Sequence, residues 1–276
     1  MKILWLTDIH LDYLLPRERR HFLQSLGLIK PEIVLVGGDI SRAGLLDNDL
    51  RAIGKAANAP VYFVLGNHDF FGSSFGSVYE QTYRLVKGTI GLHWLEHTSH
   101  INFAEGVALI GHGCWGDAGV GSYWNSELVR DMPDFREIAD FKNMNRHDRL
   151  LFLKQLGADA ARHLQESCCD AAKRHRHVIV LTHVPPFPQT SLHDGKMSET
   201  GLPFFCCLVA GKVLREVAKT FDKVQFTVLS GHSHQEARVQ ILPNLDAIVQ
   251  GAQNHKPTSR ILRLENEILV DEGIPV

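Results

Sequence analysis

The chain has 276 residues, which is enough for one large domain or two small ones. Its composition, 44% hydrophobic and 22% charged, is that of an ordinary soluble globular protein. The 29 Lys and Arg residues nearly balance the 31 Asp and Glu residues, and the net charge of −2 argues against broad electrostatic capture of nucleic acid or acidic membrane. The longest apolar runs, such as residues 204–210, are far shorter than the ~20 residues that a membrane span requires.

The N-terminal segment and the cysteines favour a cytoplasmic protein. Only five residues separate Lys2 from Asp8, which is too few for the apolar region of a secretory signal. Four of the five cysteines form adjacent pairs, at 168–169 and 206–207, and this spacing does not resemble a disulfide framework or a CxxC metal site. We therefore expect reduced thiols and a cytoplasmic location.

The first third of the chain alternates apolar strands with helical segments. The pattern predicts strands over residues 3–6, 33–36 and 61–65, and helices over 18–28 and 45–57. The second of these strands is continuously apolar, which is typical of a strand buried on both faces. Alternation of strands and helices indicates parallel pairing through crossovers, and it predicts an α/β fold.

The rest of the chain begins irregularly and ends in short strands. Residues 111–145 are rich in Gly, Trp, Tyr and Asp without a clear period, and a long irregular connection of this kind is more often functional than idle. The pattern predicts helices over 75–86, 148–168 and 211–221, and strands over 92–95, 107–110, 178–181, 226–229, 237–242, 247–250, 260–264 and 268–270. No repeat or linker divides the sequence, so we expect one domain over 1–276 with an irregular insertion at about 112–146.

Polar side chains follow five of the predicted strands. They are, in chain order, Asp8 and His10, then Asp39, then Asn67 with His68 and Asp69, then His183, and finally His232 and His234. Open α/β sheets bind ligands at the carboxyl ends of their strands, where such side chains gather. Burying carboxylates and imidazoles together is unfavourable, and a divalent cation compensates because it holds these groups deprotonated.

The spacing within two of these segments supports a shared metal site. The alternation of a strand would place Asp8 and His10 on one face, and the same parity would present His232 and His234 together. Glycines beside the polar residues fit tight turns and close approach of the backbone. The candidate ligands are too many for one ion and suit two ions that share a bridging carboxylate: Asp8, His10, Asp39, Asn67, His183, His232 and His234.

This ordered set of motifs, DxH, GGD, GNHD, a lone His and GHxH, resembles the calcineurin-like metallophosphoesterase superfamily from Asp8 to His234. The resemblance implies a four-layer α-β-β-α sandwich, with two mixed sheets packed face to face, and a site for two metals. It implies that the first metal is bound by Asp8, His10 and His234, that the second is bound by Asn67, His183 and His232, and that Asp39 bridges them. It also implies that His68 contacts the phosphate and protonates the leaving oxygen, with Asp69 orienting it.

General chemistry agrees with these roles. Two metals ~3.5–4 Å apart clamp a phosphate, offset the charge on the attacking and leaving oxygens, and generate a metal-bridging hydroxide that attacks in line. A histidine that is not a ligand is a natural acid for the leaving oxygen. Oxygen and imidazole ligands suit Mn, Fe, Zn or Ni, and the resemblance favours Mn or an Fe/Mn pair, with Zn or Ni as alternatives.

The substrate is less closely defined. Arg42 in the second motif and Asp69 at the end of the third depart from the protein serine/threonine phosphatase pattern. The motifs therefore resemble the remaining branch of the superfamily, which acts on phosphodiesters, nucleotide derivatives or small phosphomonoesters. We expect a phosphodiesterase with a small phosphoester substrate. The alternatives are a phosphomonoesterase of small phosphorylated metabolites and a non-catalytic scaffold that retains the fold. A nucleotide substrate is compatible with these motifs, whereas a nucleic acid partner would need a basic groove.

Three side chains are candidates for substrate binding. Arg42 could grip a phosphate oxygen, and the alternative is an exposed loop charge. His112 follows a predicted strand, as the metal ligands do. Trp115 belongs to an aromatic stretch that could stack a base or ring, or could pack the connection against the sandwich. The insertion at about 112–146 is therefore predicted to face the substrate.

Overall fold

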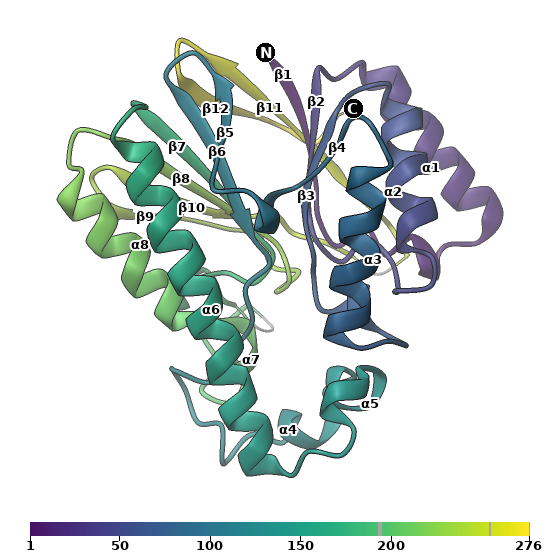
Figure 1. Ribbon diagram of the computed structural model, residues 1–276, viewed down its shortest axis with the longest axis vertical. Helices are drawn as coiled ribbons and strands as arrows, with labels where there is room; N and C mark the ends of the chain where they lie inside the picture. Colours follow the sequence, from purple (N-terminus) through teal and green to yellow (C-terminus); the bar gives the residue numbers. More distant parts are fainter. Residues whose placement is uncertain (193–194, 254, 276) are drawn as a thin grey trace.

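Two six-stranded mixed sheets lie face to face between two layers of helices in the computed structural model (Figure 1). The structure describes residues 1–192, 195–253 and 255–275. One layer of helices covers the sheet that contains the N-terminal strands, and the other covers the second sheet (Figure 1). This arrangement confirms the predicted α/β class and the four-layer sandwich.

The first sheet has the strand order β12-β11-β1-β2-β3-β4. Its four N-terminal strands are parallel and the two C-terminal strands are antiparallel. The strands are β1 (Lys2–Leu6), β2 (Ile33–Gly37), β3 (Val61–Val64), β4 (Leu92–Trp94), β11 (Ser259–Glu265) and β12 (Ile268–Gly273). Parallel strands need crossovers, which here are α1 (Pro16–Ile29), α2 (Leu46–Ala57) and α3 (Phe75–Lys87).

The second sheet has the order β5-β6-β7-β8-β10-β9, with four parallel strands between two antiparallel edges. Its strands are β5 (Ile101–Ala104), β6 (Val107–His112), β7 (His177–Thr182), β8 (Gln225–Ser230), β9 (Ala237–Leu242) and β10 (Leu245–Val249). Helices α6 (Arg146–Ala172) and α8 (Leu208–Thr220) cover it. Strand β5 was not predicted, because Phe103 alone of its four side chains is buried and the segment lacks an apolar pattern.

Alternation along the strands divides the core into three layers. In β1, Ile3 and Trp5 pack between the two sheets, whereas Leu4 and Leu6 pack against the helices. Strand β7 repeats the arrangement, with Ile179 between the sheets and its neighbours against α6 and α8. Because both faces are covered, these strands are continuously apolar and polar side chains emerge only at their ends.

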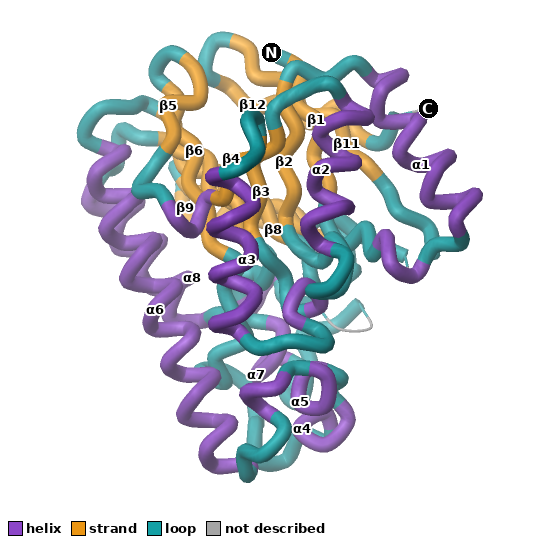
Figure 2. The backbone as a smooth tube through the Cα atoms, turned by 45° about the vertical axis from the view of Figure 1, so that its right-hand side comes forward, coloured by secondary structure: helices purple, strands orange, loops and turns teal. Residues whose placement is uncertain are grey.

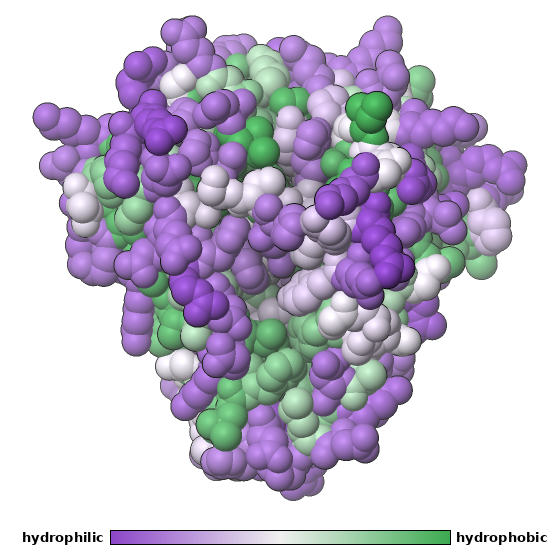
Figure 3. All heavy atoms as spheres, viewed as in Figure 1, coloured by the Kyte–Doolittle hydropathy of each residue, from purple (hydrophilic) through white to green (hydrophobic). Residues whose placement is uncertain are grey.

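Residues 113–145 form a packed segment rather than a loose connection. They contain α4 (Leu128–Asp131), α5 (Asp134–Glu137) and a 3₁₀ turn, η4 (Ala139–Phe141). Together with α7 (Leu202–Phe205) these elements lie at the end of the molecule opposite the N-terminus (Figure 2). Phe135, Ile138 and Phe141 are buried in the core of the first sheet. In the view of Figure 3 the surface is largely hydrophilic, and apolar residues gather in its lower centre.

The long helix α6 begins earlier than predicted because Asn145 caps it. The side-chain oxygen of Asn145 accepts hydrogen bonds from the backbone N–H groups of His147, at 2.9 Å, and Asp148, at 3.0 Å. None of the helices in the described part of the chain is long and apolar enough to cross a lipid bilayer.

Candidate metal centre

The carboxyl ends of the parallel strands bring the polar segments together. The backbone N–H of Asp8, just after β1, donates to the carbonyl of Gly38, just after β2, at 3.1 Å. The N–H of His10 donates to the carbonyl of Asp39 at 3.0 Å. From the second sheet, the N–H of His232 donates to both carboxylate oxygens of Asp8 at 3.0 Å. Segments from both sheets therefore meet at one edge of the sandwich.

The paired candidate ligands lie on left-handed backbone and not on extended strands. The angle φ is 52° at Asp8 and 39° at His10, and it is 64° at His232 and 56° at His234. The prediction that strand alternation pairs these side chains is therefore wrong, because the residues lie beyond the strand ends, in left-handed turns. Left-handed backbone is unfavourable for such residues by about 1–2 kcal/mol each, so the surrounding contacts hold strain at this site.

Two glycines allow the loops to approach one another, as their position in the motifs predicts. Gly38 has a φ of 89°, and a Cβ placed on it would lie 2.8 Å from Nδ1 of His183. A Cβ on Gly66 would overlap the Asp39 carboxylate. Only glycine leaves room for these side chains at both positions.

Asp8, His10 and His234 form a first group of donors, whose ligand atoms lie within 4.8 Å of one another. Nε2 of His234 lies 3.3 Å from Oδ1 of Asp8. His10 is 2% exposed, and both its ring nitrogens are buried without a hydrogen-bond partner in the described part of the structure. Buried ring nitrogens without hydrogen-bond partners are unfavourable, and coordination of a cation would satisfy one of them.

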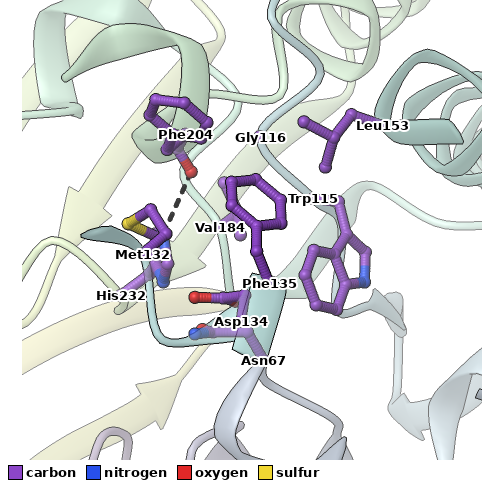
Figure 4. Close-up of a pocket in the computed structure, with 10 residues that line it drawn as sticks. All are labelled: Asn67, Trp115, Gly116, Met132, Asp134, Phe135, Leu153, Val184, Phe204 and His232. Atoms are coloured by element: carbon purple, nitrogen blue, oxygen red, sulfur yellow. Dashed lines mark hydrogen bonds between the residues drawn. The ribbon is translucent and has the colours of Figure 1, made fainter. Parts of the chain in front are cut away.

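Asp39, His183 and His232 form a second group within 4.8 Å. Nδ1 of His183 donates to the carbonyl of Gly37 at 2.9 Å, so its Nε2 carries a lone pair. Nε2 of His232 donates to the carbonyl of Phe204 at 3.1 Å (Figure 4), so its Nδ1 carries a lone pair as well. These two lone-pair nitrogens lie 3.1 Å apart.

Two lone pairs that face each other repel unless a cation lies between them. Nitrogens that each lie about 2.1 Å from one metal ion, at a right angle, are about 3 Å apart, close to what is seen here. Oδ1 of Asn67 lies 3.1 Å from Nε2 of His183, and Oδ1 of Asp39 lies 3.3 Å from the same nitrogen. One carboxylate, one amide oxygen and two neutral imidazoles fit a divalent cation.

Asp39 lies between the two groups. Its Oδ1 is 3.3 Å from His183 in the second group, and its Oδ2 is 3.7 Å from Nε2 of His10 in the first. A carboxylate that reaches both groups in this way fits a bridge between two cations.

Burial keeps most of these donors in the form that binds metal. It lowers the pKa of His10 to about 4 and of His232 to about 3, and it also lowers the pKa of His183. Burial would raise the pKa of Asp8, but hydrogen bonding and the nearby histidines bring it below its ordinary value. Burial and the negative charge of Asp8 raise the pKa of Asp39. A dication would favour the ionised carboxylate and would leave the neutral imidazoles unchanged.

His68 lies at the edge of the donor groups. Its side chain is 20% exposed, and its Nε2 is 3.9 Å from Oδ2 of Asp39. The ring stacks on Phe71, with centroids 4.2 Å apart. Its Nδ1 lies 3.2 Å from the hydroxyl of Tyr13. The ring is thus held between neighbours and keeps one nitrogen toward the site.

Asp69 is fully buried and contacts backbone N–H groups. Its Oδ1 accepts from Ile40 at 2.9 Å and from Ser41 at 3.0 Å, and its Oδ2 accepts from Gly66 at 2.8 Å. These bonds tie the loop that carries Asp39 to the loop that carries His68. Asp69 therefore fixes the position of His68 through the backbone.

The expected substrate-binding residues lie in different surroundings. The Arg42 guanidinium is half exposed and lies 3.6 Å from a carboxylate oxygen of Glu137. Trp115 is 8% exposed, packs against Phe75 with ring centroids 5.1 Å apart, and lines a cavity beside Asn67. Trp115 lies next to the donor groups, because Asn67 and His232 line the same cavity.

His112 lies in a separate cluster. Its Nδ1 accepts from the backbone N–H of Cys114 at 2.9 Å, its Nε2 is 4.0 Å from a carboxylate oxygen of Glu96, and its ring is 5.5 Å from that of His163. None of these partners is among the predicted ligands.

A cavity opens beside the second donor group (Figure 4). Its apolar wall includes Trp115, Met132, Phe135 and Phe204. The carboxyl group of Asp134 lies in the same wall as Asn67, and burial raises its pKa to about 6. Sequence patterns gave no signal for Asp134, because it lies in a segment without periodicity. Tyr13 was also missed, although it lies three residues after the predicted ligand His10.

Comparison with known proteins identifies a family. The family model described as calcineurin-like phosphoesterase matches residues 1–236. No curated protein matches the chain.

Solved structures share the fold at low sequence identity. A dimetal phosphatase from Danio rerio has a TM-score of 0.62 and 14% identity, covering 99% of this chain and 96% of that one. The phosphopantetheinyl hydrolase of Mycobacterium tuberculosis has a TM-score of 0.60 and 14% identity, covering 91% and 89%. A protein from Thermus thermophilus has a TM-score of 0.54 and 14% identity, covering 99% and 98%.

Proposed function

The chain belongs to the calcineurin-like phosphoesterase family, and we propose that it is a phosphodiesterase that uses two divalent cations. The observation that carries this proposal is the pair of donor groups that meet at Asp39, with His68 beside them. Asp8, His10 and His234 would hold the first cation, and Asn67, His183 and His232 the second. We favour Mn or an Fe/Mn pair, with Zn or Ni as alternatives, because the donors are oxygens and imidazoles.

The chain's own residues supply orientation and a proton. When bound, two such cations clamp a phosphate and lower the pKa of the attacking water. As water attacks phosphorus and the bond to the leaving oxygen breaks, His68 delivers the proton from Nε2 to that oxygen. Burial and the neighbouring His10 lower the pKa of His68 to about 2, and the negative charge of a bound phosphate acts in the opposite direction.

Residues around the donor groups would select the substrate. We propose that Arg42 contacts a phosphate oxygen, because its charge acts on Tyr13, whose hydroxyl lies 3.2 Å from Nδ1 of His68. Trp115 would contact the organic part of a small phosphoester from the cavity wall. His112 would support Trp115 indirectly, because its Nδ1 accepts from the backbone N–H of the neighbouring Cys114. All five cysteines are free thiols, which supports a cytoplasmic location.

Metal removal and two esters test the proposal. Treatment with EDTA should abolish hydrolysis of bis-p-nitrophenyl phosphate, and Mn²⁺ should restore it. His68→Ala should retain both metals in elemental analysis and lower kcat on diphenyl phosphate, whose more basic leaving phenolate needs a proton, by ~10²–10⁴, whereas the exposed His21→Ala should change neither. Activity that is indifferent to metal would contradict the proposal. A higher kcat/KM on p-nitrophenyl phosphate than on the diester would favour a phosphomonoesterase instead.

A further inference from the structure

Tyr13 is fixed in place beside the donor groups by its backbone. It ends the 3₁₀ helix η1 (Leu11–Tyr13), which starts directly after His10. Its N–H donates to the carbonyl of His10 at 2.9 Å, and its own carbonyl accepts from Nδ1 of His255 at 3.1 Å. The backbone of Tyr13 is therefore held at both its N–H and its carbonyl.

The Tyr13 side chain makes two separate contacts. Its ring stacks on His10, with centroids 5.2 Å apart and planes 12° from parallel. Its hydroxyl lies 3.2 Å from Nδ1 of His68. The ring thus contacts a proposed metal ligand, and the hydroxyl contacts the proposed proton donor.

Neighbouring residues contact the ring and Nδ1 of His68, so Nε2 is the nitrogen that can react. Phe71 stacks on one face of the ring, and His10 approaches with its centroid 4.5 Å away. Tyr13 occupies Nδ1, and Nε2 is directed toward Asp39. The Asp69 carboxylate accepts three backbone N–H groups elsewhere, so the partner of Nδ1 is the phenol of Tyr13.

We propose that Tyr13 is the positioning residue for His68, and that it makes the enzyme competent toward esters with basic leaving groups. Its hydroxyl accepts the Nδ1–H of His68, so that this proton stays on Nδ1 while the Nε2 proton moves to the leaving oxygen. The water oxygen bonds to phosphorus, the bond to the leaving oxygen breaks, and neutral His68 remains in its Nδ1–H form. The inference rests on the proposed function, because it assigns a partner to the proposed acid.

Tyr13→Phe separates the two contacts of this side chain. The variant keeps the ring on His10 and removes only the hydroxyl. A p-nitrophenolate leaves without help from an acid, whereas the phenolate of diphenyl phosphate is more basic and needs a proton. We expect kcat on diphenyl phosphate to fall about tenfold, the size of one hydrogen bond to a charged group. The value on bis-p-nitrophenyl phosphate should stay within about twofold, and KM for both esters should be unchanged.

Two controls distinguish positioning from a general loss of structure. Tyr83→Phe removes a hydroxyl from α3, where the ring contacts His97 and Lys87, and should leave both rates unchanged. In a His68→Ala background, Tyr13→Phe should have no further effect. Independently of activity, ¹⁵N NMR of histidine-labelled protein loaded with diamagnetic Zn²⁺ should show a shifted His68 Nδ1 signal in Tyr13→Phe, with His68 assigned from its loss in His68→Gln.

The contrary outcomes distinguish failure of the role of Tyr13 from failure of the proposed function. Equal losses on both esters, an added loss in the His68→Ala background, or an unshifted His68 signal would overturn the role of Tyr13 while leaving the phosphodiesterase in place. Absence of metal-dependent hydrolysis of either ester by the wild-type protein would overturn the proposed function, and this inference with it.

Discussion

The backbone N–H of His232 donates to both carboxylate oxygens of Asp8, across 224 positions of sequence. The contact joins the last predicted metal-binding segment to the first. The hydroxyl of Thr7 also donates to Oδ2 of Asp8, at 2.6 Å. The Asp8 carboxylate is therefore oriented by protein groups, as metal ligands commonly are.

Gly231→Ala should weaken metal binding at the first site although it changes no predicted ligand. A Cβ at this position would overlap Oδ2 of Asp8 and Oγ1 of Thr7, so the carboxylate must move. Isothermal titration with Mn²⁺ should show the first site lost or weakened by at least about tenfold. Gly76→Ala in α3 is the matched control, because a Cβ there meets nothing within 4 Å. Normal titration of Gly231→Ala would show that Asp8 is not a ligand in the proposed geometry.

Asp39→Asn should make the metal-free protein more stable while removing its response to metal. Burial and the charge of Asp8 disfavour the Asp39 carboxylate, and asparagine retains the Oδ1 that accepts the His68 N–H at 2.9 Å. We expect the Tm in EDTA to rise by about 2–6 °C, at about 2–4 °C per kcal/mol. The rise in Tm that Mn²⁺ produces in the wild type should disappear.

Asp49→Asn is a control for which the expected change in Tm has the opposite sign. Asp49 is as buried as Asp39, but it pairs with Arg19, so its neutralisation should lower Tm with or without metal. If Asp39→Asn lowers the Tm in EDTA as Asp49→Asn does, the charge of Asp39 is balanced by the protein alone. The argument for a bridging cation would then lose its main support.

The set of candidate donors could be predicted because a buried carboxylate or imidazole needs a compensating partner, and few partners can supply this. Asp39 directly follows a continuously apolar strand, and a carboxylate at such a place needs a compensating partner. The same reasoning placed His183 at the end of β7. Chemistry and strand ends, both visible in the sequence, were enough to predict which side chains gather in the donor groups.

The way in which the ligands converge could not be predicted, because it depends on tertiary contacts. Asp8 and His10 adopt left-handed backbone while their N–H groups donate to the loop after β2. No local propensity favours this conformation for Asp or His in preference to an extended strand. Tyr13 meets His68 across 55 positions, and Asp134 meets Asn67 from a segment without a hydrophobic pattern. Such pairs depend on the fold rather than on any local pattern.

His177 joins the two sheets in its neutral form. Its Nδ1 donates to the carbonyl of Glu267 at 2.6 Å, and its Nε2 accepts from the hydroxyl of Thr227 at 2.9 Å. Glu267 lies in the turn between β11 and β12 of the other sheet. Burial lowers the pKa of His177, so the folded protein takes up a proton on this ring less readily than the unfolded chain.

The unfolding free energy should therefore fall in mild acid. The contribution of His177 is fully present above the unfolded pKa, about 6.5, and is lost as pH falls toward the lower folded pKa. His177→Asn keeps a donor for Glu267 but does not titrate. Between pH 7.5 and 5.5 the wild type should lose more stability than this variant, by up to about 1.4 kcal/mol per pH unit. Urea unfolding in EDTA at each pH measures the difference, and parallel curves would refute it.

Trp115 should have separable roles in stability and in substrate binding. Its indole packs against Phe70 and Phe75, so Trp115→Ala should lower the unfolding free energy by about 3–5 kcal/mol. Trp115→Phe retains most of this packing but shortens the cavity wall, so KM for bis-p-nitrophenyl phosphate should rise about threefold with kcat unchanged, on the scale of one lost apolar contact.

Phe141→Leu is the matched control for this measurement. Phe141 is fully buried, and its ring centroid lies 6.0 Å from that of Trp115, but it is not among the residues that line the cavity beside Asn67. It should lose stability, by about 1–2 kcal/mol, without any change in KM. If Trp115→Phe matches Phe141→Leu in both measurements, the indole serves only to pack the segment over residues 113–145 against the first sheet. The selection of substrate must then come from the exposed side of the donor groups, where Arg42 lies.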